Sequence, residues 1–62
     1  MTRLKQVRES KGISQLELAR LAGVKAPTVC SLERKGIFDT RTAKKYAVAL
    51  NCASIILLDG LD

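Results

Sequence analysis

The side chains that most often catalyse reactions or bind metals are scarce in this sequence. It has no histidine, and its two cysteines, Cys30 and Cys52, lack the close spacing of a zinc-binding CxxC pair. Its six acidic residues are scattered, so no carboxylate pair is placed for acid–base catalysis, and no glycine-rich phosphate loop is present. We therefore expect no enzyme activity, no metal and no cofactor.

The composition instead favours the binding of an anion. The chain carries 11 Lys and Arg residues against 6 Asp and Glu residues, a formal net charge of +5. Such an excess on a small domain is typical of proteins that bind nucleic acid or a membrane surface. The longest strongly apolar run, Ile55–Leu58, is far shorter than the roughly 20 residues needed to cross a bilayer. The N-terminus also lacks the apolar segment of a signal peptide. We expect a cytoplasmic, nucleoid-associated protein with no membrane partner.

Helix signals recur along the 62 residues, which have room for one domain, residues 1–62. Ser14 and Glu17 form a capping box, in which the hydroxyl accepts from the Glu17 amide and the carboxylate reaches back. Pro27 fits the first turn of a helix that begins near Ala26. Asp39 or Thr40 can cap a further helix. Strand-like alternation is nearly missing, so the sequence predicts an all-α fold. The five helices are expected near residues 3–11, 14–23, 26 onward, 40–50 and 53–58.

The segment from Ile13 to Arg34 carries an ordered set of motifs. It has Ser-Gln at a helix start, then Leu-Ala, then Ala-Gly-Val at a turn, and finally two aliphatic residues three apart followed by Glu-Arg. This order resembles the helix-turn-helix of the phage repressor and Cro family, also called the XRE family. The likeness continues through Tyr46–Cys52 and the closing Leu57-Leu58, so it covers practically the whole chain.

The resemblance implies a compact five-helix repressor-like bundle whose helices 2 and 3 form the helix-turn-helix, at about residues 14–34. In this family, helix 3 enters the major groove of double-stranded DNA. The implied function is sequence-specific DNA binding by a transcriptional regulator, with repression favoured over activation. The residues expected to read bases are Lys25, Ala26, Pro27, Thr28, Ser31 and Arg34, and those expected to bind phosphates are Gln15, Arg8, Lys35 and Arg41.

One departure from the family pattern and one pairing refine this expectation. Relatives often carry Gln, Ser or Thr where this chain has Lys25, Ala26 and Pro27, so the operator sequence is harder to infer than the fold. In the family, an arginine of helix 1 often pairs with the glutamate that closes helix 3. Arg8 and Glu33 stand at those positions, so we expect a structural ion pair between them.

Consecutive apolar residues at the C-terminal end predict a dimer contact. Four successive residues of a helix point all round it, so Ile55 or Ile56 must stay outside the core. The resemblance places this segment at the two-fold contact of DNA-bound dimers. We expect a homodimer on a palindromic operator, and a weakly associating or monomeric protein when free.

Two other function classes compete with this interpretation. The first is a protein-interaction module, such as an antirepressor or an antitoxin-like subunit, because Ala26 and Pro27 make the outer face of helix 3 apolar. Its binding would depend little on salt, whereas DNA affinity falls steeply with salt. The second is RNA or single-strand binding, for which Phe38 and Tyr46 supply too few aromatic side chains.

Overall fold

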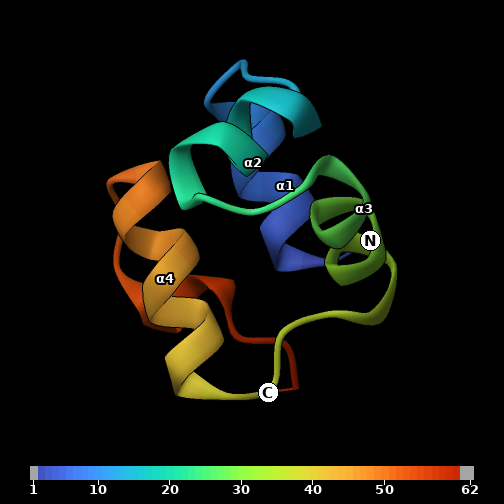
Figure 1. Cartoon of the computed structure of the whole chain (residues 1–62). Coiled ribbons are helices and arrows are strands. Elements are labelled where there is room, and N and C mark those ends of the chain that lie inside the picture. Colours follow the sequence, from blue (N-terminus) through green and yellow to red (C-terminus); the bar gives the residue numbers. More distant parts are fainter. Residues whose placement is uncertain (1, 61–62) are drawn as a thin grey trace.

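The computed structural model describes residues 2–60, and this part of the chain consists of helices joined by turns and short irregular segments, with no strand. The expected all-α class is confirmed. Figure 1 shows four α-helices wrapped around a common centre, followed by one 3-10 turn near the C-terminus. In chain order, the elements are α1 (Arg3–Ser10), α2 (Gln15–Ala22), α3 (Ala26–Lys35), α4 (Thr40–Leu50) and η1 (Ser54–Leu57).

Three of the four α-helices begin at a side chain that accepts a backbone hydrogen bond. Thr2 caps α1, Ser14 caps α2 with an Oγ to Glu17 N distance of 3.1 Å, and Asp39 caps α4. Such caps satisfy amides that have no partner inside the helix. The Glu17 carboxylate does not complete the capping box: it accepts from Arg20 Nη1 at 3.3 Å.

The expected fifth α-helix over residues 53–58 is wrong, because the chain forms the 3-10 turn η1 there. Its flanking residues, Ala53 and Leu58, are extended, and no side chain caps the turn. In an α-helix, successive side chains would point about 100° apart. The short turn followed by an extended residue lets the adjacent Leu57 and Leu58 both enter the core.

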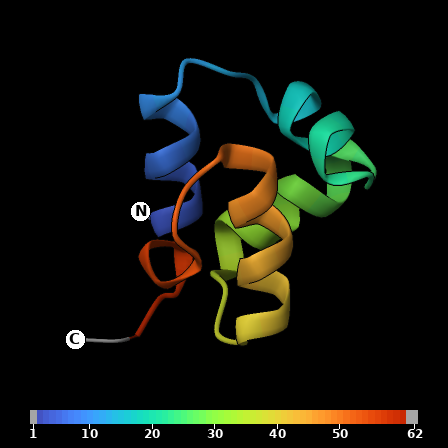
Figure 2. The ribbon, with the colours of Figure 1, turned by 90° about the vertical axis from the view of Figure 1, so that its left-hand side faces the viewer.

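The core lies where α2 meets α3 and α4, and α1 and η1 also contribute side chains to it. Figure 2 shows η1 lying beside α1 and α4. Glu33 on α3 is the one buried charged side chain of residues 2–60. No helix in that part of the chain is long and apolar enough to span a membrane. The core residues are Leu4, Leu18, Ala19, Val29, Ile37, Ala43, Tyr46, Ala47, Leu50, Leu57 and Leu58.

Asp59 joins the C-terminal segment to two other parts of the fold. Its carboxylate accepts from the backbone N–H of Arg3 at 3.1 Å and from that of Ile37 at 3.0 Å. Its own N–H donates to the Ile37 carbonyl at 2.8 Å. Gly36 has φ +92°, and a Cβ there would lie 2.8 Å from the Asp59 carboxylate. A glycine is therefore required where the chain leaves α3.

Candidate DNA interface

The C-terminal half of α3 is attached to α1 by a buried ion pair. Arg8 Nε lies 2.5 Å from Glu33 Oε2, and the side chains are 11% and 3% exposed. Arg8 Nη2 also donates to Glu33 Oε1, and Nη1 donates to the Ile13 carbonyl at 2.7 Å. The hydrogen bond to Glu33 raises the pKa of Arg8, against the opposing effect of burial, so the guanidinium stays charged. This is the ion pair that the family resemblance implies.

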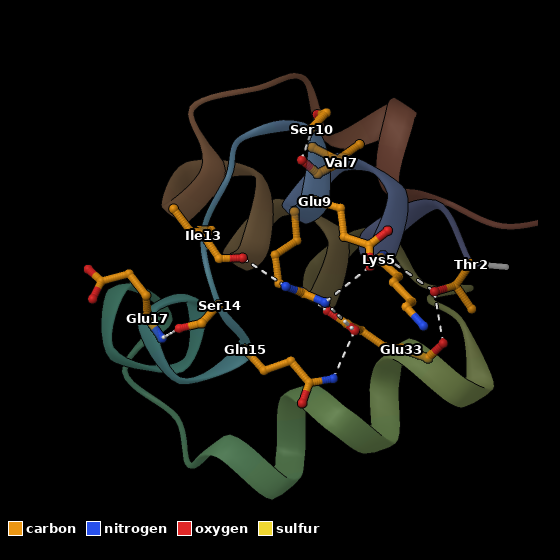
Figure 3. Close-up of polar contacts among 11 residues, drawn as sticks. Thr2, Lys5, Val7, Glu9, Ser10, Ile13, Ser14, Gln15, Glu17 and Glu33 are labelled. Carbon is orange, nitrogen blue, oxygen red and sulfur yellow. Dashed lines mark hydrogen bonds and ion pairs between the residues drawn. The ribbon is translucent and has the colours of Figure 1, made fainter.

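Two further contacts to Glu33 could not be predicted from the sequence pattern. Gln15 Nε2 donates to Glu33 Oε1 at 2.9 Å, and Thr2 Oγ1 donates to the Glu33 carbonyl oxygen at 2.9 Å. Figure 3 shows the Gln15 side chain directed at the Glu33 carboxylate, and the Ile13 carbonyl directed at the guanidinium that pairs with Glu33. We call Arg8, Gln15, Thr2 and Glu33 the Glu33 network. It fixes α3 against both α1 and α2.

Residues expected to read bases occupy the outer side of α3, but not all are equally exposed. Lys25, Pro27, Thr28 and Arg34 are exposed, and Ser31 is half-buried. Ala26, also in the expected set, is half-buried and packs against the core. The buried side of the helix carries Val29 and Glu33. The outer face therefore offers hydroxyl, guanidinium and ammonium groups next to the Pro27 ring.

A family model described as helix-turn-helix matches residues 4–57, from α1 to the end of η1. The chain belongs to the XRE-type helix-turn-helix family. It is thus a DNA-binding transcription regulator of that type. Neither the curated proteins nor the solved structures include a match to the chain. Within the XRE-type fold, α2 and α3 are the helix-turn-helix, and Gly23, with φ 72°, makes the turn between them.

The basic side chains around α3 form no ion pair with the described carboxylates of this XRE-type domain. Among the described acidic side chains, Glu9 and Glu33 pair with Arg8, and Glu17 pairs with Arg20. Asp39 caps α4, and Asp59 accepts from the backbone amides of Arg3 and Ile37. Across residues 2–60, none of the remaining basic side chains expected at the interface forms an ion pair; these are Lys25, Arg34, Lys35 and Arg41. Their charge is available to an anionic partner.

The other expected site residues lie on different elements. Gln15 stands at the first turn of α2, where amides favour an anion, but one N–H of its side chain already donates to Glu33. Arg8 directs all three of its nitrogens to protein acceptors, so it serves first as a structural group. Ile55 and Ile56 on η1 are 62% and 41% exposed, so much of each side chain lies outside the core.

Proposed function

We propose that this protein binds double-stranded DNA sequence-specifically by placing α3 in the major groove, and that it represses transcription at the sites it occupies. The observation that carries the proposal is the division of α3 into two sides. Its inner side is held by Val29 and the Glu33 network, and its outer side presents polar and basic groups to solvent. A helix that reads bases needs this fixed orientation.

The outer residues of α3 supply different kinds of base contact. The hydroxyls of Thr28 and Ser31 can donate to acceptors, or accept from donors, on the base edges in the major groove. Arg34 can donate two hydrogen bonds to a guanine. Lys25 extends from the start of the helix. The apolar surfaces of Pro27 and Ala26 can contact a thymine methyl group.

The phosphate contacts come from the elements on either side of α3. The Gln15 amide has two N–H donors, and only one is used by Glu33, so the second can donate to a phosphate. Lys35 ends α3 and Arg41 lies in the first turn of α4, and both are exposed. Arg8, whose side chain is 11% exposed, completes the set of proposed phosphate contacts.

A homodimer on DNA would bring two copies of α3 to successive major grooves. One recognition helix reads only a few base pairs, and half-sites about 34 Å apart supply the missing specificity. The exposed Ile55 and Ile56 support a self-association surface on η1. The patch is small, so the free protein should be monomeric at micromolar concentration.

Selection of bound sequences from random duplex DNA tests this function. The expected result is a palindromic consensus whose binding weakens steeply as salt rises. Ile55→Glu and Ile56→Glu should remove cooperative binding to the two half-sites while leaving single-half-site affinity unchanged. If no sequence is enriched, sequence-specific DNA recognition is rejected.

A second candidate function is docking of a protein partner, as in an antirepressor or antitoxin-like subunit. Large apolar side chains outside η1 support it, among them Leu16 on α2 and Val48 on α4, which is 76% exposed. Binding of such a partner should hardly respond to salt, which separates it from DNA binding.

A further inference from the structure

A groove runs between α3 and α4, beside the outer face of α3. The two helices take their main packing from other elements, because α3 lies against α1 and α2, whereas α4 lies against α2 and η1. The space left between them is about 530 Å³ and open to solvent on one side. It is lined by Val24, Pro27, Thr28, Ser31, Leu32 and Lys35 on one wall and by Thr42, Lys45 and Tyr46 on the other.

Tyr46 brings an unusual polar group to this groove. The residue is only 1% exposed, yet within residues 2–60 its hydroxyl has no hydrogen-bond partner. No fully buried side-chain oxygen of the same residues lacks a partner, so the hydroxyl must be the atom that reaches the surface. Burial raises the pKa of Tyr46 above its ordinary value, so the hydroxyl stays protonated and remains a donor. The hydroxyl is therefore a donor at the wall of the groove that no described protein group uses.

The groove wall also includes the apolar Val24, Pro27 and Leu32, but its charged and polar side chains favour an anionic acceptor. Lys35 and Lys45 supply two positive charges, and Ser31 and Thr42 supply hydroxyl donors. The lining includes no carboxylate. Thr28 and Ser31 belong both to this groove and to the residues proposed to read bases. Any DNA strand seated on α3 would therefore pass over the groove.

We propose that this groove holds one phosphodiester group of the bound DNA strand, with the Tyr46 hydroxyl and the Lys45 ammonium as its donors. The inference rests on the DNA-binding function proposed above. It makes α4 part of the binding surface and gives Tyr46 a role besides its packing in the core. It also gives Lys45 a phosphate contact that its neighbour Lys44 lacks, because Lys44 lines a different groove beside Val48.

Salt dependence separates the two lysines. Binding of Lys45→Gln and Lys44→Gln is compared with that of the parent on a selected duplex and on a mixed-sequence duplex, between 50 and 200 mM salt. Loss of one phosphate contact should lower the slope of log K against log salt by about 0.9, which corresponds to about fivefold weaker binding at 0.15 M salt. Lys45→Gln should show this change on both duplexes, and Lys44→Gln should not. Equal slopes for the two variants would overturn the proposal.

The hydroxyl is tested by Tyr46→Phe, which keeps the aromatic ring in the core. Because the hydroxyl has no partner in the protein, the melting temperature should not fall. Affinity for both duplexes should fall about tenfold, because a bond to a charged acceptor is lost, while the salt slope stays that of the parent. An affinity equal to that of the parent would show that the hydroxyl contacts no phosphate.

Neutral methylphosphonate links, placed one at a time in the selected duplex, locate the contact. One position should weaken the parent and cause no further loss in Lys45→Gln, because both changes remove the same interaction. If every position weakens the two proteins equally, the groove holds no phosphate, although the parent still binds DNA and its proposed function stands. Failure of the parent to bind either duplex would instead reject both proposals.

Discussion

The two ends of α3 are built in opposite ways. At its start, Lys25 is exposed and provides no side-chain cap, and Pro27 and Thr28 point to solvent. Near its end, Glu33 is buried and receives donors from α1 and α2, and the next residues turn at Gly36 against Asp59. The start and end of one ten-residue helix therefore differ in how tightly the protein holds them.

This difference explains how a domain of 62 residues can present a recognition helix. An N–H that donates within the protein to hold a helix cannot also donate to a ligand. Here the holding contacts lie on the inner side and near the C-terminal end, through the Glu33 network. The donors and acceptors near the start and along the outer face remain available.

Loss of the Glu33 carboxylate should have the largest effect on stability. Glu33→Ala leaves the buried Arg8 charge without its partner, and breaking such a pair costs about 3–5 kcal/mol of the free energy of unfolding. In a domain of this size, that is a fall of more than about 12 °C in melting temperature. Glu17→Ala is the matched control, because its pair with Arg20 is largely exposed and should be worth less than about 1 kcal/mol. Equal melting temperatures for the two variants would show that the end of α3 is not held by Glu33.

Removal of the Asp59 carboxylate should have the next largest effect. Asp59→Ala takes the acceptor away from the backbone amides of Arg3 and Ile37, and we expect a cost of about 1–2 kcal/mol, as for loss of a helix cap. Urea unfolding measures this change, with Glu9→Ala as an exposed acidic control. Unchanged stability would mean that the loop after α3 is held without Asp59.

The open start of α3 should be improvable. Lys25→Ser places a capping hydroxyl at a residue whose backbone is already extended, and a new cap should add about 0.5–1 kcal/mol to the free energy of unfolding. Lys25→Ala separates this gain from simple loss of the lysine and should add nothing. DNA affinity should fall in both variants, because each removes a positive charge. A stability gain in Lys25→Ala as large as in Lys25→Ser would contradict the capping explanation.

The start of α4 gives the smallest effect, and one that depends on pH. The backbone hydrogen bond from Thr42 lowers the pKa of Asp39. A carboxylate with a lowered folded-state pKa stabilises the protein above its unfolded value, near pH 4, and this contribution is lost as pH falls through the folded value. Stability curves of the parent and Asp39→Asn should therefore converge as pH falls below about 4. Parallel curves down to pH 2 would show that the cap contributes nothing through its charge.

Local signals predicted most of the fold and part of the interface. Ser14, Gly23 and Asp39 act over three or four residues, so the sequence alone indicated where α2 and α4 begin and where α2 ends. The resemblance supplied the Arg8 and Glu33 pair, which joins residues 25 positions apart.

What could not be predicted depends on the packing of distant segments. The Gln15 amide was expected at a phosphate and donates to Glu33, because folding brings the start of α2 against the end of α3. No sequence pattern indicated the contacts of the Asp59 carboxylate or of the Tyr46 hydroxyl. Asp59 binds backbone amides of distant segments, and Tyr46 lines a groove between two helices. The η1 turn replaced a helix because Leu57 and Leu58 both had to reach the core.

On the function proposed here, the outer face of α3 selects the DNA sequence. The most direct measurement is selection from random duplex DNA carried out in parallel with the parent, Ser31→Ala and Lys35→Gln. Ser31→Ala should change the preferred base at one position of each half-site, with a loss of about 1–3 kcal/mol at the original base. Lys35→Gln should keep the parent consensus and weaken all duplexes alike. If all three proteins select the same consensus and both variants lose affinity equally for every sequence, α3 does not read the DNA.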